Sequence, residues 1–409
     1  MTVKEVCASV KAHATAIART TEQDKNRILE ICANALTSRA DDILRANEQD
    51  VLSAKKEGKG DGFIDRLTLT HARIEGIAEG LRQLLALPCP VGEIMEDRTL
   101  ANGLQLQRVR VPMGVVGIIY EARPNVTADA IGLCIKSGNA VVLRGSRDAL
   151  QSNVAIVDVM KDALTKNGYD AGFIGLITDA TREGATEFMR QKDTVDVLIP
   201  RGSAGLIRAA VENSLIPVIE TGTGNCHVYV EKNADFQKAI DILVNAKTQR
   251  ISVCNACESL LVDAQIANEF LPVVAQVLME KEVVVHACAR SLPLMQKANP
   301  IPATEEDFHK EYLAMEISVK VVDDYQSAVE FINAHSTHHS ESIITEDKKA
   351  AEYFLEHVDS AAVYHNASTR FTDGFEFGLG AEMGISTQKL HARGPMGLKE
   401  LTSYKYVVR

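Results

Sequence analysis

The stretch Val115-Val116-Gly117-Ile118-Ile119-Tyr120-Glu121-Ala122-Arg123-Pro124-Asn125-Val126-Thr127 passes from a short apolar run, through a polar turn, into an amphipathic segment. Such a run, bounded by turn formers, is typical of a buried strand, and the segment after the turn favours a helix. Asn125 follows the carboxyl end of the strand, where open α/β sheets hold ligands. An asparagine there is also commonly a helix cap or turn former.

Similar units continue on both sides of this stretch. Short β-branched runs predict strands at 140–143, 173–177, 195–199 and 227–230. Amphipathic segments predict helices at 127–136, 149–166, 182–191 and 204–213. This alternation predicts a mostly parallel sheet covered on both faces, as in dinucleotide-binding domains. Neither a strict G-x-G-x-x-G nor a G-x-x-x-x-G-K-[ST] sequence accompanies it.

The length of the chain, 409 residues, exceeds that of an ordinary single core and predicts two domains. Residues 2–87 have apolar spacing of three and four with polar breaks at 21–24 and 57–62, which predicts helices. After a helix at 234–247, further strands are predicted at 259–262, 283–286, 319–322, 342–344 and 361–364. We therefore expect a first domain at 1–230, a second at 231–365 and a return segment at 366–409.

A projecting hairpin is predicted at 98–111. Asn102-Gly103 is a two-residue turn signal, and apolar residues roughly alternate with polar ones after it. Because an isolated hairpin is unstable in water, this one must pair with another segment.

The composition is that of a soluble globular protein and argues against several classes of partner. Hydrophobic residues make up 46% and charged residues 24% of the chain, and the net charge is −11. Because there is no Lys/Arg-rich run and no apolar run of transmembrane length, we expect neither a nucleic-acid nor a membrane partner. The 8 scattered cysteines and the absence of an apolar leader predict a cytoplasmic location.

The stretch Gln249-Arg250-Ile251-Ser252-Val253-Cys254-Asn255-Ala256-Cys257-Glu258 contains the candidate nucleophile, Cys254. Short uncharged neighbours leave the thiol reachable, and nearby backbone N–H groups can lower its pKa. A cysteine taken alone is more often a small buried hydrophobe. Cys254 and Cys257 also form a C-x-x-C, as in redox dithiols and zinc sites. No second pair lies at metal-ligand spacing, so no metal is predicted.

Together with Val218-Ile219-Glu220-Thr221-Gly222-Thr223-Gly224-Asn225-Cys226-His227, this loop resembles the active-site region of the aldehyde dehydrogenase superfamily, most closely that of the γ-glutamyl phosphate reductases. The resemblance runs from about the first helix to the C-terminus. It implies an α/β fold of two Rossmann-like domains with a small β element for oligomerisation, made of the hairpin and a strand at 401–408. A homo-oligomer, at least a dimer, is expected.

The resemblance also implies the reaction, which is NADPH-dependent reduction of L-glutamate 5-phosphate to L-glutamate 5-semialdehyde and phosphate in L-proline biosynthesis. Cys254 would carry a thioester, and Asn125 matches the asparagine whose side-chain N–H helps to bind the oxyanion. Functional coupling to glutamate 5-kinase is expected on the same ground.

The expected cofactor residues follow from the same match. Arg144, Ser146 and Arg147 come directly after a strand whose end contacts the adenosine ribose in the superfamily, so they are candidates for a 2′-phosphate clamp that favours NADPH. Gly202 and Ser203 open a helix whose N–H groups favour a pyrophosphate. Without the match, a solvated arginine pair and a plain loop explain these residues at least as well.

Other candidates also have two interpretations. Glu311 approximately matches the glutamate that holds the nicotinamide ribose, or is a surface carboxylate on a helix. Glu220 stands where hydrolytic aldehyde dehydrogenases carry the carboxylate that activates water, a role that resolution by phosphate makes unnecessary. The histidine-containing run 335–342 lacks a partner carboxylate or cysteine at ligand spacing and matches a family loop before a strand.

Ser368, Thr369 and Arg370 are weaker candidates for contacts with the amino-acid end or the phosphate of the substrate. Two other functions stay open. A hydrolytic NAD-linked aldehyde dehydrogenase would share the fold and the cysteine but would not need phosphate. A non-enzymatic redox or zinc-binding protein would use Cys254 and Cys257 together.

Overall fold

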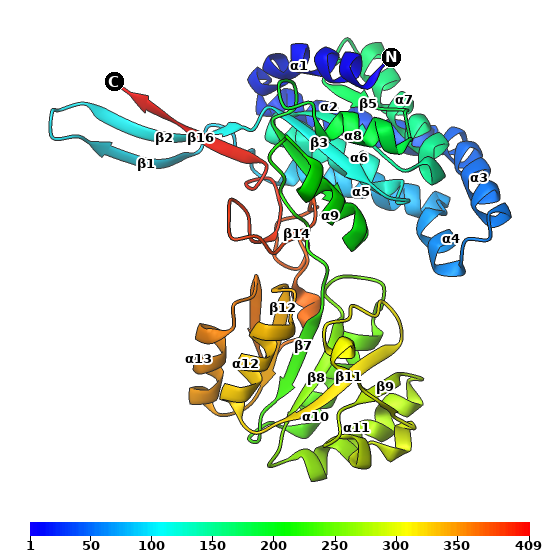
Figure 1. The fold of residues 1–409 in the computed structure, drawn as a ribbon. Helices are drawn as coiled ribbons and strands as arrows, with labels where there is room; N and C mark the ends of the chain where they lie inside the picture. The colour runs from blue at the N-terminus through cyan, green and yellow to red at the C-terminus, as the bar shows by residue number, and fades with distance from the viewer. The chain divides into compact units, whose positions relative to one another are not determined.

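The computed structural model describes all 409 residues, which divide into two compact units. The first comprises Met1–Thr221, Gly378–Gly384 and Pro395–Arg409, and the second comprises Gly222–Phe377 and Ile385–Gly394 (Figure 1). The predicted boundary at 230 differs from this division. Strand β7 (Cys226–Val230) pairs on both of its sides with strands of the second unit, so it belongs there rather than to the first domain.

Helices occupy most of the first 86 residues, as the apolar spacing predicts. They are α1 (Val3–Arg19), α2 (Glu22–Ser38), α3 (Ala40–Lys56), α4 (Asp61–Leu67) and α5 (His71–Ala86). Thr2 and Thr21 cap the first two helices through hydroxyl groups that accept backbone N–H bonds. The break at Arg39 was not predicted, because no glycine or proline marks it. Its guanidinium is held by Asp42 and Asp162.

A four-stranded parallel sheet in the order β5-β4-β3-β6 forms the centre of the first unit. Its strands are β3 (Val115–Tyr120), β4 (Ala140–Arg144), β5 (Ile174–Leu176) and β6 (Val197–Arg201). The helices are α6 (Asn125–Ser137), the 3₁₀ turn η1 (Arg147–Ala149), α7 (Leu150–Lys166), α8 (Arg182–Met189) and α9 (Ala204–Asn213). Every residue of β3 and β4 is buried, so the sheet is covered on both faces.

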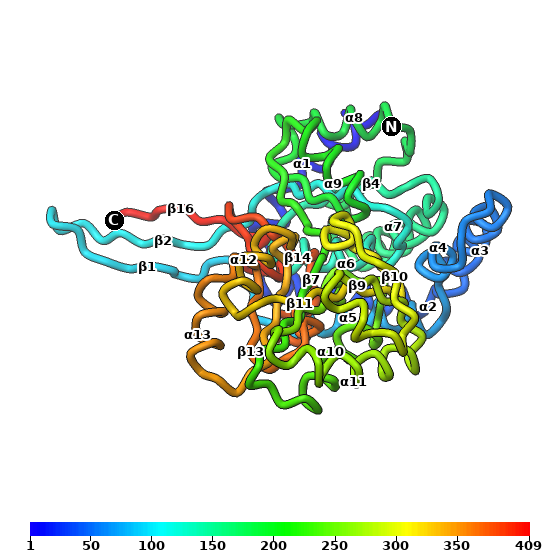
Figure 2. The backbone as a smooth tube through the Cα atoms, turned by 60° about the horizontal axis from the view of Figure 1, so that its bottom comes forward, coloured from blue at the N-terminus to red at the C-terminus, as the bar shows by residue number.

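The predicted hairpin is present but begins earlier than expected. Strands β1 (Ile94–Thr99) and β2 (Gln105–Pro112) pair antiparallel, and β16 (Thr402–Val408) pairs with the other edge of β2. Gly103 lies in the turn with φ +88°, a conformation that few other residues adopt at low cost. The three-stranded ribbon projects from the helices of its unit in both views (Figures 1 and 2).

The second unit is built on a seven-stranded parallel sheet in the order β10-β9-β11-β8-β7-β12-β13. Besides β7, its strands are β8 (Cys257–Asp263), β9 (Val284–Ala287), β10 (Ile301–Pro302), β11 (Glu316–Val322), β12 (Ser340–Ile344) and β13 (Ala362–His365). The helices are α10 (Phe236–Thr248), α11 (Ala267–Glu280), α12 (Tyr325–His335) and α13 (Lys348–His357), with 3₁₀ turns η2 (Leu292–Leu294), η3 (Gln296–Ala298), η4 (Glu305–Phe308) and η5 (Thr369–Phe371). Two short strands follow, β14 (Ile385–Ser386) and β15 (Gly394–Pro395).

Helices cover both faces of this sheet, and alternate residues of each strand face opposite ways. Val228 and Val230 join a core with α10 and α11, whereas Tyr229 between them joins a core with α12 and α13 (Figure 1). The parallel α/β architecture expected from the sequence is therefore confirmed. No helix of the chain is both long and apolar enough to cross a membrane.

Candidate active site

Cys254 lies at the corner of a tight turn between α10 and β8. The Ala256 N–H donates to the Val253 carbonyl oxygen at 3.2 Å, which places Cys254 and Asn255 at the two central positions. The Cys254 side chain is half-buried, and none of the cysteines of the chain is in a disulfide. The nucleophile predicted from the sequence is therefore a reduced thiol on a short, constrained loop.

A buried ion pair joins the two ends of this loop. Nζ of Lys247, in the last turn of α10, lies 2.5 Å from Oε2 of Glu258, near the start of β8. Burial raises the pKa of Glu258 to about 7, although the nearby ammonium opposes the rise. The pair restrains the spacing between α10 and β8 and hence the span of the loop that carries Cys254.

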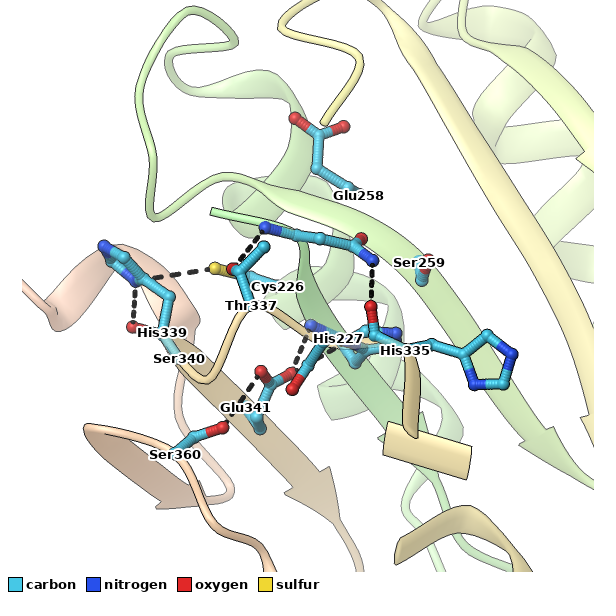
Figure 3. A network of polar contacts seen from close by, with 12 residues as sticks. Cys226, His227, Glu258, Ser259, His335, Thr337, His339, Ser340, Glu341 and Ser360 are labelled. Carbon is cyan, nitrogen blue, oxygen red and sulfur yellow. Dashed lines mark hydrogen bonds and ion pairs between the residues drawn. The ribbon is translucent and has the colours of Figure 1, made fainter. Parts of the chain in front are cut away.

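The floor beneath Cys254 is formed by the chain just before and at the start of β7. Gly224 packs so closely that any Cβ there would overlap the Cys254 carbonyl. The Cys226 thiol donates to the Cys254 carbonyl oxygen at 3.1 Å. His339 Nδ1 lies 3.7 Å from Cys226 Sγ, and Figure 3 shows the imidazole and the thiol joined through this contact. Burial raises the pKa of Cys226 well above its usual value and lowers that of His339 to about 4, so both are neutral at neutral pH.

The other side of the turn is clamped by the segment around η5. Asn255 Nδ2 donates to the Thr372 carbonyl at 2.9 Å, and Thr369 Oγ1 donates to the Asn255 carbonyl at 2.8 Å. Ser368 Oγ accepts from the Arg370 N–H at 3.2 Å. Two of the three weak substrate candidates, Ser368 and Thr369, thus use their hydroxyl groups to hold this segment and the nucleophile loop.

Arg370 is the third of these candidates, and its guanidinium is half-buried beside the nucleophile loop. Nη1 donates a hydrogen bond to Asn255 Oδ1, and Nε donates to Gln249 Oε1 at 3.2 Å. Burial lowers the pKa of Arg370, while the charges of Asp373 and of a Cys254 thiolate raise it. A permanent cation therefore lies within electrostatic range of the nucleophile, where it favours a thiolate.

Glu311 is brought to the same place by the fold. It lies in the loop between η4 and β11, not on a helix, and its Oε1 accepts the Gly224 N–H at 2.7 Å. Gly224 therefore donates its N–H to Glu311, the residue expected to hold the nicotinamide ribose. It also packs closely against the nucleophile loop. The positions of Glu311 and Cys254 in the sequence do not indicate that the fold brings these two residues to the same place.

Asn125 is the first residue of α6, directly after the loop that follows β3. Its Nδ2 donates to Asp129 Oδ2 at 3.1 Å, one helical turn further on. Burial raises the pKa of Asp129 to about 6. The side-chain amide is thus aimed by a carboxylate that the sequence analysis did not identify.

The three residues expected at the adenosine end have different surroundings. Arg144 is buried, and its Nη2 donates to the Thr181 carbonyl at 2.7 Å. Arg147 is exposed, and its Nη2 lies 3.1 Å from Glu57 Oε1. Arg144 Nε and Ser146 Oγ are buried without a hydrogen-bond partner, as expected of groups that a ligand would satisfy. These residues fit a phosphate-bearing group, with Arg147 as the accessible guanidinium.

The expected pyrophosphate position is taken by an acidic side chain. Ser203 caps α9, and both its N–H and its hydroxyl donate to the Glu121 carboxylate at 2.8 Å. A Cβ at Gly202 would lie 2.7 Å from Glu121 Oε2. The start of α9 binds a carboxylate of the chain itself where a pyrophosphate was expected, and a pyrophosphate would have to displace this side chain.

Cys257 is buried within β8, where its thiol donates to the Ser259 carbonyl at 3.4 Å. Burial raises its pKa to about 12. A buried thiol of raised pKa is a poor nucleophile, so Cys257 does not supply the reactive thiolate of a redox pair.

Comparison with known proteins agrees with this fold. A model of the aldehyde dehydrogenase family matches residues 1–288. The γ-glutamyl phosphate reductase of Lachnospira eligens is 52% identical over 94% of this chain and 92% of its own length, and that of Agathobacter rectalis is 50% identical over 99% and 97%. The crystal structure of γ-glutamyl phosphate reductase from Thermotoga maritima matches with a TM-score of 0.97 at 43% identity, covering 100% of this chain and 98% of that one.

The two parallel α/β sheets belong to an aldehyde dehydrogenase-like fold. The chain belongs to the aldehyde dehydrogenase family and, within it, to the γ-glutamyl phosphate reductases.

Proposed function

We propose that this protein reduces L-glutamate 5-phosphate to L-glutamate 5-semialdehyde, with release of phosphate, in L-proline biosynthesis. The observation that carries the proposal is the nucleophile loop. The chain that contains this loop has 52% and 50% sequence identity to two proteins named γ-glutamyl phosphate reductase. Cys254 lies on a turn that Cys226 supports from below and Asn255 anchors from the side.

The loop supplies what acyl transfer from a phosphate requires. The Cys254 thiolate attacks the acyl carbon, a carbon–sulfur bond forms, and the bond to the phosphate oxygen breaks as phosphate leaves. Phosphate is a good leaving group, so no dedicated general acid is needed. The Arg370 guanidinium favours the thiolate, and it is our candidate for contact with the departing phosphate.

The oxyanion formed in this step requires hydrogen-bond donors. We assign them to the Asn125 side-chain amide and the Cys254 backbone N–H, each worth about 3 kcal/mol in comparable sites. Asp129 accepts one N–H of the Asn125 amide, which leaves the other N–H to donate.

The electron donor we propose is NADPH, which would supply hydride to the acyl carbon of the thioester. Arg147, Ser146 and Arg144 would hold the adenosine end with its 2′-phosphate. Gly202 and Ser203 would hold the pyrophosphate in place of the Glu121 carboxylate, and Glu311 would hold the nicotinamide ribose. After reduction, release of the aldehyde restores the Cys254 thiolate.

The direct test is the reverse reaction. The full chain is incubated with L-glutamate 5-semialdehyde, inorganic phosphate and NADP⁺, and the absorbance of reduced nicotinamide is followed. Turnover that requires all three components supports the proposal. Oxidation that proceeds equally well without phosphate would instead favour a hydrolytic aldehyde dehydrogenase.

We also propose that the ribbon of β1, β2 and β16 joins copies of this chain. Large apolar side chains are exposed along it: Ile94, Leu104, Tyr404, Tyr406 and Val408. An exposed strand edge with such side chains is a ready pairing surface. A molar mass of at least a dimer in solution, reduced by truncation before Leu401, supports this assignment, and a monomeric mass contradicts it.

The acyl phosphate substrate implies a preceding reaction. A kinase acting on the γ-carboxylate of glutamate must supply it, so functional coupling to glutamate 5-kinase stays a prediction. Co-purification of the two proteins, or faster turnover with the kinase present than with a matched amount of preformed substrate, would support it.

A further inference from the structure

Three side chains far apart in the sequence meet at the surface of the second unit. Glu305 is in η4, His309 follows that turn, and His335 is the last residue of α12. Their ligand atoms all lie within 4.8 Å of one another. From the sequence, no metal is expected at the histidine run, because no carboxylate stands at ligand spacing. The fold supplies that carboxylate from 30 residues upstream, at Glu305.

The hydrogen-bonding geometry of His335 turns one ring nitrogen toward the Glu305 carboxylate. Nδ1 lies 2.8 Å from the Phe331 carbonyl oxygen, and Nε2 lies 2.8 Å from Glu305 Oε1. Both oxygens can only accept, so Nδ1 carries a hydrogen, and the Nε2 contact needs either a second ring proton or a metal ion in its place. A histidine that donates one ring N–H to a backbone carbonyl while the other nitrogen binds metal is the usual arrangement in metal sites.

We propose that Glu305, His309 and His335 form a binding site for Zn²⁺, with water in the remaining position. The exposed His309 ring stacks on the His335 ring, with centroids 4.5 Å apart and planes at 24°, so a second imidazole lies next to the carboxylate and has to turn out of this stack to bind the same ion. A donor set of two imidazoles and a carboxylate favours zinc over calcium or magnesium. An open fourth position is common where only three side chains bind.

The two segments that carry the ligands are already fixed to each other. Asn225 is buried, and its Nδ2 donates to the Phe308 carbonyl at 2.7 Å and to the His335 carbonyl at 3.0 Å. The Phe308 and Phe331 rings pack edge to face with centroids 5.5 Å apart. Figure 3 shows His335 at the edge of this network, with its ring turned away from Cys226. The two backbone segments therefore need little ordering for binding, and the main change is rotation of the exposed His309 side chain.

One positive charge opposes the cation. Lys320 Nζ lies 4.9 Å from the Phe308 ring centroid and 4.5 Å from that of Phe331, and its charge acts on Glu305. We therefore expect micromolar rather than nanomolar affinity for zinc. Removing the ammonium in Lys320→Met should tighten binding, which provides a variant that strengthens the site without touching a ligand.

The test is a calorimetric titration of the full chain with Zn²⁺ alone, repeated in a Cys254→Ser background so that zinc on the nucleophile is accounted for. Glu305→Gln, His309→Ala and His335→Gln should each weaken binding by about tenfold or more. Co²⁺ should give the visible absorption of a histidine-bound ion, lost in the same variants.

His357 provides a matched control. It ends α13 as His335 ends α12, its Nδ1 lies 2.9 Å from the Tyr353 carbonyl, and its ring stacks on Tyr353 at 4.0 Å, but no ion pair involves it. His357→Gln should leave zinc binding unchanged. The proposal is overturned if zinc binding disappears with Cys254→Ser alone, if the three ligand variants bind as tightly as the parent, or if no micromolar binding occurs.

Discussion

The Cys226 thiol donates a hydrogen bond to the backbone carbonyl of Cys254 at 3.1 Å. This contact holds the residue that carries the nucleophile from beneath, at the point where Gly224 allows the two backbones to meet. Because burial keeps Cys226 protonated, the thiol stays a donor at neutral pH. The proposed nucleophile, Cys254, is thus positioned by a second cysteine, which the sequence indicated only as part of a family motif.

Cys226→Ala should lower kcat about fivefold with little change in KM, because one hydrogen bond of about 1 kcal/mol no longer orients the nucleophile. Cys226→Ser restores a donor and should recover part of the loss. The measurements are steady-state kinetics and the rate of Cys254 alkylation. Cys257→Ala is the control, because it removes a buried thiol that donates to the Ser259 carbonyl rather than to the Cys254 carbonyl. Equal effects of the two alanine variants on alkylation would show a general packing effect rather than positioning.

Cys254→Ser should abolish turnover, since a serine hydroxyl is a far weaker nucleophile near neutral pH. Cys257→Ser should leave most of the activity, because its thiol is buried with a pKa of about 12. Activity is followed by reduced nicotinamide absorbance, and both variants are checked for native circular dichroism. Loss of activity in both folded variants would instead indicate that Cys254 and Cys257 act together as a dithiol.

Much of the architecture was predictable because it depends on local patterns. The strands β3 and β4 are short apolar runs, and α1 to α3 show regular apolar spacing, so their periods identify them. The boundary at β7 was wrong because an apolar run carries no information about which sheet it joins. The helix break at Arg39 was missed because ion pairs with the nearby Asp42 and the distant Asp162, not a glycine or proline, accompany it.

The candidate site was only partly predictable for a similar reason. Cys254 and Asn125 belong to recognisable motifs, but their partners depend on the fold. Glu311 meets Gly224 across two loops, for which no spacing rule exists. Asp129 lies at the i,i+4 spacing from Asn125, but the helix was predicted to begin at residue 127, so Asn125 was not placed on it. Likewise, Glu121 reaches the start of α9 only because β3 and β6 are neighbours in the sheet.

Arg147→Ala should raise KM for NADPH by about tenfold or more and leave KM for NADH nearly unchanged, because an exposed guanidinium can bind a 2′-phosphate directly. Arg144→Ala should act differently. Its side chain is buried against the Thr181 carbonyl, so we expect lower thermal stability and weaker binding of both cofactors. Arg19→Ala, an exposed arginine on α1, is the control. If Arg147→Ala weakens NADPH and NADH alike, this residue is not the 2′-phosphate site.

Asp129 should make the first unit less stable as pH rises. Its folded pKa of about 6 lies above the ordinary value of 3.8, so the folded state holds the proton more tightly, and stability falls as pH rises from about 4 through 6. The stability of the Asp129→Asn variant should not fall in this way as pH rises, because an asparagine side chain does not titrate. Between pH 5 and 7.5, the difference in unfolding free energy between variant and wild type should shift by roughly 1 kcal/mol in favour of the variant. Urea unfolding at the two pH values measures it, and the exposed Asp158→Asn should show no comparable shift.

The resolution of the thioester on Cys254 separates acyl phosphate chemistry from aldehyde hydrolysis. If phosphate resolves it, oxidation of the semialdehyde requires inorganic phosphate or arsenate, and Glu220→Gln keeps substantial activity because no water has to lose a proton. If water resolves it, oxidation persists in phosphate-free buffer, and Glu220→Gln accumulates an acyl-enzyme that mass spectrometry detects on Cys254. The fold and the nucleophile are the same in both cases, so only this pair of measurements distinguishes the reductase from a hydrolytic dehydrogenase. We expect strict dependence on phosphate, because the attacking and leaving groups of the proposed reaction are a thiolate and a phosphate, and neither needs a base to activate water.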